Sequence, residues 1–187
     1  TAAELAREDR LYGWVGRLDE LVHGNNAQRI TLQTYVLSVL LDEVLELASE
    51  RLMTMSKGRY SVRRREDVTD RRARSGLDLD VEDAYTGQMR PVSTLSGGES
   101  FMAALSLALG LSDVIQRHSG GIYLETLFID EGFGSLDSEA LDLAIRMLVE
   151  LRAGGRTVGV ISHVEELKRT ITQQIKVVPL GGGSMIT

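Results

Sequence analysis

The sequence predicts an α/β fold: a mostly parallel sheet with flanking helices, a small antiparallel sheet, and a helical amino-terminal part. From Ser93 onward, near-continuous apolar segments of strand length alternate with helical ones, which is typical of a parallel sheet covered on both faces. Residues 60–65 and 77–85 alternate in polarity as strands of an antiparallel sheet do. Before residue 57, apolar residues recur at helical spacing.

Two helices are predicted in the amino-terminal part. Apolar residues at 11, 14, 15, 18, 21 and 22 favour a helix over 4–22, which the polar turn at Gly24 ends. Thr31 is a suitable N-cap for a second helix over 32–56, roughly 35–40 Å long. Two interpretations stay open: the root of a longer helical arm, or a helical hairpin packed on the domain that follows.

The antiparallel region carries a charged connection. Six arginines lie between 63 and 74 beside three acidic residues, and the turn at Gly87 leads into a third strand near 89–92. A solvated hairpin loop is one interpretation. The other is that Arg71, Arg72 and Arg74 contact DNA phosphates, as a local basic patch on an acidic protein.

The α/β region is predicted element by element from its apolar runs and its glycine turns. The expected order is a helix over 99–117, a buried strand over 123–130, a helix over 138–153, a buried strand over 157–162, a short helix over 164–170, and a hairpin of 175–180 with 184–186.

Composition limits the class of protein. The 187 residues can form one domain with an extension, and 43% apolar content supports a core. A net charge of −6 argues against a generally basic nucleic-acid coat. There is no cysteine, which suits a reducing cytosol, and no apolar run approaches the ~20 residues of a membrane helix. The start at Thr1, without Met, suggests a piece of a longer chain.

The first candidate site is the glycine-containing loop before the helix over 99–117. Ser96, Gly97 and Gly98 would let backbone N–H groups face an anion at a helix N-terminus, and Ser96 adds a hydroxyl donor. The loop has no lysine, and no G-x-x-x-x-G-K-[ST] phosphate loop occurs in the 187 residues. The loop could therefore complete a phosphate site but not hold a triphosphate alone. The alternative is a plain helix entry.

The second candidate site is a carboxylate pair at a strand end. Asp130 could hold Mg²⁺, directly or through water, and Glu131 could orient and deprotonate an attacking water. His163 ends the next strand and could donate a hydrogen bond to a γ-phosphate, although a structural histidine is the alternative. Asp137 starts the following helix, where a first-turn charge is also common.

In order and spacing these residues resemble the ABC-ATPase superfamily. Its signature motif corresponds to Leu95–Glu99, Walker B to Leu127–Glu131, the D-loop to Ser135–Asp137, and the switch histidine to His163. Within the superfamily the chain resembles the carboxyl-terminal head segment of SbcC-type, SMC-like DNA-repair ATPases. The closer markers are the stretches Met55–Tyr60, Thr86-Gly87, Asp130–Asp137 and Ile161–Val164.

The resemblance implies that residues 1–57 are the helical arm end and root helix, and that 58–187 are the carboxyl-terminal lobe of an ABC-ATPase head. ATP would be bound through Ser96, Gly97, Gly98, Glu99 and Asp137, with Mg²⁺ on Asp130 and catalysis by Glu131 and His163.

The resemblance also implies partners. They are an amino-terminal phosphate-loop segment, a second head in a homodimer, an SbcD-type nuclease subunit and duplex DNA, in a cytoplasmic, nucleoid-associated setting without a membrane. Without the phosphate-loop segment the chain should be inactive. The alternatives are an SMC-type chromosome organiser and a transporter ATPase. Glu99, where a transporter would carry Gln, and the helical arm argue against the transporter.

Overall fold

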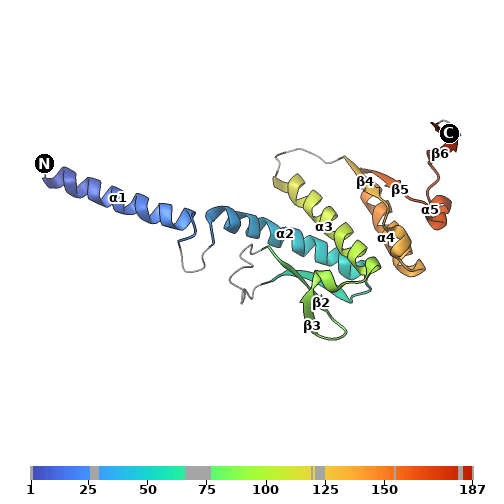
Figure 1. Ribbon diagram of the computed structural model, residues 1–187, viewed down its shortest axis with the longest axis horizontal. Coiled ribbons are helices and arrows are strands. Elements are labelled where there is room, and N and C mark those ends of the chain that lie inside the picture. The colour runs from blue at the N-terminus through green and yellow to red at the C-terminus, as the bar shows by residue number, and fades with distance from the viewer. Residues whose placement is uncertain are drawn as a thin grey trace.

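The computed structural model describes residues 2–25, 30–65, 77–118, 120, 125–153, 155–180 and 183–186 (Figure 1). The elements are α1 (Ala2–Val22), α2 (Leu32–Met55), β1 (Tyr60–Arg64), β2 (Leu79–Asp83), β3 (Gln88–Pro91), η1 (Val92–Thr94), α3 (Gly97–His118), β4 (Thr126–Asp130), η2 (Phe133–Ser135), α4 (Ser138–Ala153), β5 (Thr157–Ile161), α5 (Glu165–Thr170), β6 (Val177–Leu180) and β7 (Gly183–Ile186).

Helix α1 projects away from the rest of the molecule (Figure 1). Its apolar residues lie at the predicted helical spacing, and they are exposed rather than packed on the domain: Leu11, Trp14, Val15, Leu18 and Leu21. The described residues of α1 do not pack on the domain as a hairpin would, and the assignment of this helix to an arm stays a prediction. Thr31 caps α2 as predicted, because its side-chain oxygen accepts a hydrogen bond from the Thr34 N–H at 3.1 Å.

The carboxyl-terminal half of α2 packs against α3 and forms much of the core. Val44, Ala48 and Leu52 of α2 are 0–5% exposed, and Leu109 of α3 is 0% exposed. Gly110 allows the close crossing of the two helices: a Cβ there would lie 2.7 Å from the Val44 carbonyl oxygen. The root helix thus shares a core with the lobe, and the division at residue 57 stays a prediction.

The antiparallel sheet has the order β1-β2-β3, with Val62 opposite Val81. α2 covers the outer edge of β1, where the Ser49 hydroxyl donates to the Val62 carbonyl at 2.8 Å and accepts from the Val62 N–H at 3.0 Å. This side chain satisfies backbone groups that an edge strand would otherwise leave unpaired.

The charged connection between β1 and β2 lies partly within the described residues. The three arginines at its start, two of them at the end of β1, form ion pairs with carboxylates: Arg63 with Glu82, Arg64 with Asp42, and Arg65 with Asp80. The charges of these three arginines are therefore paired with carboxylates of the same chain. Arg71, Arg72 and Arg74 lie outside the described residues, so their DNA contact stays a prediction.

β4 and β5 are parallel and in register, with Asp130 opposite Ile161, as the alternation predicted. Described elements cover one face of these strands, and the predicted cover on the other face is not tested by this chain alone. Leu127 and Ile129 pack against the core, whereas Phe128 is 72% and Ile161 is 56% exposed on the other face. The apolar side chains of these strands predicted burial, but no described element packs on the face that carries Phe128 and Ile161.

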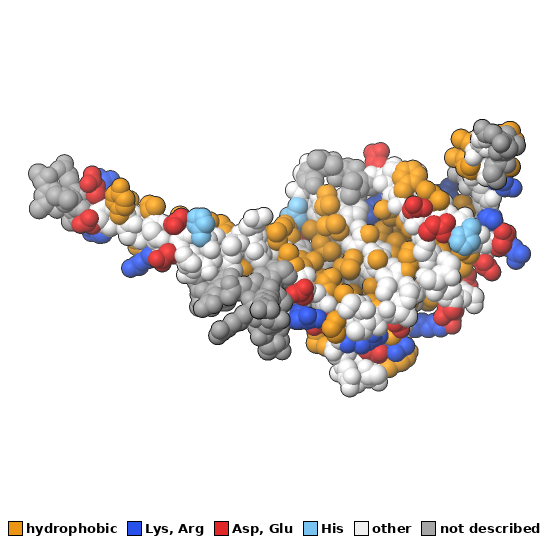
Figure 2. Space-filling view, in the orientation of Figure 1, with side chains coloured by type: hydrophobic (Ala, Val, Ile, Leu, Met, Phe, Trp, Pro, Cys, Tyr) orange, Lys and Arg blue, Asp and Glu red, His pale blue; other side chains and the backbone are white. Residues whose placement is uncertain are grey.

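Exposed hydrophobic side chains gather over the part of the lobe that contains α3, α4 and β4 (Figure 2). By length and mean hydropathy (1.3 over its most apolar window), α3 is the one described helix that could span a membrane. Its buried residues instead pack into the core with α2 and α4. The final hairpin forms as predicted from β6 and β7, which pair Val177 with Ile186.

Candidate functional site

The signature loop, Leu95–Glu99, is closed by a capping box. The Glu99 carboxylate accepts the Ser96 N–H at 2.8 Å, and the Ser96 hydroxyl oxygen accepts the Glu99 N–H at 3.4 Å. The Ser96 hydroxyl keeps its own proton to donate. Gly97 and Gly98 occupy the first helical positions, where N–H groups have no intrahelical acceptor. The geometry leaves these N–H groups at the helix N-terminus, and their binding of an anion stays a prediction.

The Glu99 carboxylate contacts two side chains of the antiparallel sheet, Tyr60 of β1 and Arg90 of β3. Its other carboxylate oxygen accepts a hydrogen bond from the Tyr60 hydroxyl at 2.6 Å, and an Arg90 guanidinium nitrogen lies 3.7 Å from the first. Burial alone would raise the pKa of Glu99, but the hydrogen bonds from Tyr60 and Ser96 outweigh it and lower that pKa below its usual range. The sequence assigned Glu99 to ATP binding; the structure has both of its oxygens in contacts within the chain.

The loop after β4 brings the motifs together. Glu131 has φ 58° and Gly132 φ 99°, which turns the chain sharply off the sheet edge. A Cβ on Gly132 would lie 2.2 Å from the ring of Phe101, which also packs edge-on against Phe133 with centroids 4.8 Å apart. The signature helix α3 is therefore packed directly against this loop.

Gly98 has a structural role in that packing. A Cβ on Gly98 would lie 2.6 Å from the Ser135 carbonyl oxygen, whereas one on Gly97 would lie 3.8 Å from the nearest atom, the Ser135 Cβ. The sequence assigned both glycines to anion binding. The structure shows that Gly98 is also needed for the close approach of α3 to the D-loop, Ser135–Asp137.

Asp130, Glu131 and His163 lie at the carboxyl edge of the parallel pair. Asp130 is opposite Ile161 in the register, and Glu131 N–H donates to the Ile161 carbonyl at 2.9 Å. The His163 Nδ1 then lies 3.1 Å from Glu131 Oε2, with both side chains exposed to solvent. The structure thus joins the two residues to which the sequence assigned catalysis, at the edge where open parallel sheets bind ligands.

Asp137 caps α4, since its Oδ1 accepts the Ala140 N–H at 2.8 Å. This is the alternative that the sequence left open for Asp137, and its other oxygen could still face a ligand. Asp130 is exposed at its strand end, and no described cluster of three acidic or histidine side chains surrounds it. Such a site fits Mg²⁺ that is held by one carboxylate together with substrate phosphates, rather than by a protein cage.

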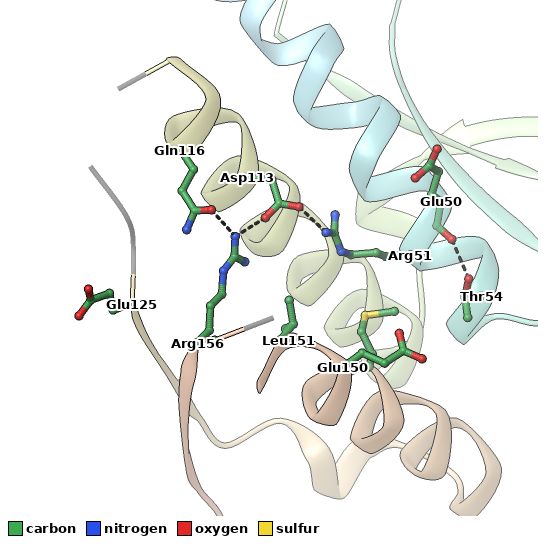
Figure 3. Close-up of a pocket in the computed structure, with 11 residues that line it drawn as sticks. Glu50, Arg51, Thr54, Asp113, Gln116, Glu125, Glu150, Leu151 and Arg156 are labelled. Atoms are coloured by element: carbon green, nitrogen blue, oxygen red, sulfur yellow. Dashed lines mark hydrogen bonds and ion pairs between the residues drawn. The ribbon is translucent and has the colours of Figure 1, made fainter. Parts of the chain in front are cut away.

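A pocket of about 650 Å³ lies at the opposite edge of the sheet (Figure 3). It is lined near the amino ends of β4 and β5 by Glu125 and Arg156, away from the carboxyl edge where Glu131 and His163 lie. Asp113 of α3 pairs there with both Arg156 and Arg51. These ion pairs connect α2, α3 and the residue before β5, so we assign the pocket a structural role.

Sequence reasoning missed three residues of the site: Tyr60, Arg90 and Phe101. The spacing Ser96-x-x-Glu99 is a readable capping-box signal, which could have assigned Glu99 to the helix entry. Nothing in the sequence spacing pairs Tyr60 with Glu99, because 39 positions separate them.

The family model and the curated relatives agree on one family. Residues 66–150 match the family model described as SbcC/RAD50-like, Walker B motif. The SbcC subunit of the SbcCD nuclease from Vibrio cholerae serotype O1 is 58% identical over 175 residues, covering 94% of this chain and 17% of that protein. The protein of the same name from Treponema pallidum is 48% identical over 169 residues, covering 90% and 16%.

Among solved structures, an SMC ATPase described in terms of ATP-driven dimerization and DNA-stimulated activation superposes with a TM-score of 0.60 at 18% identity, covering 82% of this chain and 88% of that one. The Smc head domain from Pyrococcus furiosus, bound to the C-terminal domain of ScpA, gives 0.61 at 16% identity, covering 97% and 42%. At such identity these likenesses show the fold alone.

The chain spans about a sixth of the length of the curated relatives it matches. Over that span, its sequence matches the SbcC proteins and its fold matches SMC-type heads. Over the residues matched, the chain therefore belongs to the SbcC/RAD50-like family and has the fold of an SMC-type ATPase head.

Proposed function

We propose that this chain forms the carboxyl-terminal lobe of an ATP-hydrolysing head in an SbcCD-type nuclease, acting in DNA double-strand-break repair and in processing DNA ends and hairpins. One observation carries the proposal: Glu131 and His163 meet at the carboxyl edge of the sheet, and the loop that carries Glu131 packs against the signature helix. The 58% identity to an SbcC protein favours this function over an SMC-type chromosome organiser, which shares only the fold.

Glu131 is the general base of the proposed reaction. Its side chain is 51% exposed, and the residue follows the end of β4 with a backbone φ of 58°. It can therefore orient a water against a phosphate and accept its proton. His163 Nδ1 lies 3.1 Å from Glu131 Oε2. With the proton on Nδ1 the ring donates to Glu131, and with the proton on Nε2 it can donate to a γ-phosphate.

The signature loop serves the ATP of a second head. Backbone N–H groups of Gly97 and Gly98, the Ser96 hydroxyl and the N-terminus of α3 attract negative charge. The loop contains no lysine to hold a triphosphate alone, so it completes a site that another head's phosphate loop supplies. A head dimer with two such shared sites follows from this arrangement.

Asp130 would hold the Mg²⁺ that accompanies ATP, and Asp137 would contact the nucleotide across the dimer. When bound, the ion neutralises charge on the phosphates. The open face of β4 and β5, with Phe128 and Ile161, would be covered by the amino-terminal phosphate-loop segment.

The remaining partners follow from the name of the relatives. An SbcD-type nuclease subunit would act with the head, and duplex DNA would be the substrate, with Arg71, Arg72 and Arg74 as phosphate contacts. A cytoplasmic, nucleoid-associated location agrees with that substrate.

The test is ATP turnover by the chain alone and by the chain co-purified with its phosphate-loop segment. The chain alone should show no turnover above a Glu131→Gln control, and the complex should hydrolyse ATP. In the complex, Glu131→Gln should bind ATP and trap the dimer, since an amide cannot accept the proton. Asp130→Ala should instead weaken Mg²⁺-dependent nucleotide binding.

Two outcomes would overturn the proposal. Turnover by the isolated chain would show that no phosphate-loop partner is required. A complex that hydrolyses ATP equally well with Glu131→Gln would remove Glu131 from the reaction.

A further inference from the structure

We propose that Tyr60 is a positioning residue for the signature loop: through Glu99 it fixes the loop in the conformation that engages the ATP of the opposing head. The inference rests on the proposed function and deepens it. Tyr60 belongs to the antiparallel sheet rather than to any nucleotide motif, and it is 2% exposed. Among the described residues, its hydroxyl contacts the carboxylate of Glu99, and through Glu99 it can act on the signature loop.

The hydroxyl of Tyr60 is placed by the fold. The Tyr60 N–H donates to the Ser56 hydroxyl at 2.9 Å at the C-cap of α2, which fixes the start of β1. The hydroxyl then donates to Glu99 Oε1 at 2.6 Å, a short bond to a charged acceptor. Burial first, and then this hydrogen bond, raise the pKa of Tyr60, so it remains a proton donor at neutral pH.

The two carboxylate oxygens of Glu99 have separate tasks. Oε1 is held by Tyr60, which leaves Oε2 directed at the Ser96 N–H, 2.8 Å away. Ser96 is the residue whose hydroxyl and backbone start the anion site. Without the Tyr60 bond, the Glu99 side chain would gain rotational freedom and the capping box would loosen.

A second group, Arg90, reinforces the same geometry. Its guanidinium donates to the carbonyl and the hydroxyl oxygen of Thr94 at 2.7 Å each, lies over the Tyr60 ring, and approaches Glu99 Oε2 at 3.7 Å. It thus joins the segment before the signature loop to the Tyr60–Glu99 pair. Tyr60 and Arg90 therefore contact both sides of the signature loop: Arg90 contacts Thr94 before it, and Tyr60 contacts Glu99 at its end.

Arg59 holds the Tyr60 ring from the sheet side. Its guanidinium carbon lies 4.6 Å from the Tyr60 ring centroid and 5.3 Å from that of Tyr85, and it pairs with Asp83 at 2.9 Å. Asp83 is 3% exposed and the Arg59 side chain is 38% exposed, so the pair joins a buried carboxylate of β2 to a partly exposed guanidinium. The contact with Arg59 helps to fix the orientation of the Tyr60 ring, whose hydroxyl donates to Glu99.

The matched pair of variants is Tyr60→Phe and Tyr85→Phe, in the head complex with its phosphate-loop segment. Tyr60→Phe keeps the ring and removes the hydroxyl that donates to Glu99 Oε1. Tyr85 is 71% exposed and its ring contacts Arg59. The readouts are ATP binding by a single head at low protein concentration, the ATP concentration at half-maximal turnover, kcat and the melting temperature.

Tyr60→Phe should raise the ATP concentration for half-maximal dimerisation and turnover by about tenfold, as expected for losing a hydrogen bond to a charged group. ATP binding by a single head should stay unchanged, because the signature loop serves the other head's nucleotide. Tyr85→Phe should match the parent in every readout. A general folding defect would instead lower single-head binding and turnover together.

A double-mutant cycle separates positioning from packing. In a Glu99→Ala background, Tyr60→Phe should have no further effect on the ATP requirement, because the bond it removes is already gone. Equal effects of Tyr60→Phe with and without Glu99, or an unchanged ATP requirement in a complex that dimerises with ATP, would overturn the inference. A parent complex that does not dimerise with ATP would refute the proposed function instead.

Discussion

Gly97 and Gly98 are adjacent in the signature loop, yet the structure predicts opposite responses to a methyl group. Gly98→Ala would place its Cβ 2.6 Å from the Ser135 carbonyl oxygen, and contacts under 3.0 Å are essentially never seen. The helix and the D-loop would have to separate by at least ~0.4 Å. Gly97→Ala meets only the Ser135 Cβ at 3.8 Å, an ordinary contact.

The magnitudes follow from these distances. Overpacking against a backbone atom costs about 1–3 kcal/mol, because a carbonyl in a short turn cannot rotate away as a side chain can. Both residues lie in α3, and neither has a positive φ. Gly97→Ala should therefore gain about 0.4–1 kcal/mol by reducing the freedom of the unfolded chain.

The assay is urea unfolding of the head complex without nucleotide, so that effects on ATP binding do not enter. Gly98→Ala should lower the unfolding midpoint and Gly97→Ala should leave it equal or higher. If both variants shifted the midpoint downward alike, or if Gly98→Ala were neutral, the close approach of α3 to Ser135 would not be the reason for the second glycine.

Two further predictions concern charge and the open sheet face. Burial raises the pKa of Asp113, but hydrogen bonds from Arg156 and Arg51 outweigh it and lower that pKa. Its stabilisation is therefore present above the ordinary carboxyl range and lost as pH falls through the lowered pKa. Asp113→Asn should lower stability at pH 7 and make urea midpoints less sensitive to acid below about pH 4; an unchanged acid slope would contradict this. Phe128→Ser should reduce light scattering by the isolated chain and weaken its binding to the phosphate-loop segment by roughly tenfold or more. Unchanged affinity in a titration would place the partner elsewhere.

The order of helices and strands was predictable because each element carries its own local signal. The spacing of apolar residues located α1 and α4, and Thr31 is the N-cap that its hydroxyl and position suggested. The parallel pairing of β4 with β5 followed from the helix between them. These signals act over a few residues, and so they can be read without the fold.

Burial and long-range contacts were less predictable. The apolar composition of β4 predicts cover on both faces of the strand, but it does not say which segment supplies the cover; within this chain Phe128 is exposed. The bond between Tyr60 and Glu99 depends on how the antiparallel sheet sits under α3, which no local pattern encodes. The structural role of Gly98 likewise depends on a loop 37 positions later.

The central claim is that each ATP is shared between the Glu131 of one head and the signature loop of the other. It is tested by mixing two inactive head complexes, one with Glu131→Gln and one with Ser96→Arg, which blocks the anion-facing loop entry. In a mixed dimer one site carries both defects and the other carries neither. An equal mixture should therefore recover up to about a quarter of the parent turnover. No recovery, in mixtures shown to form mixed dimers, would contradict the claim.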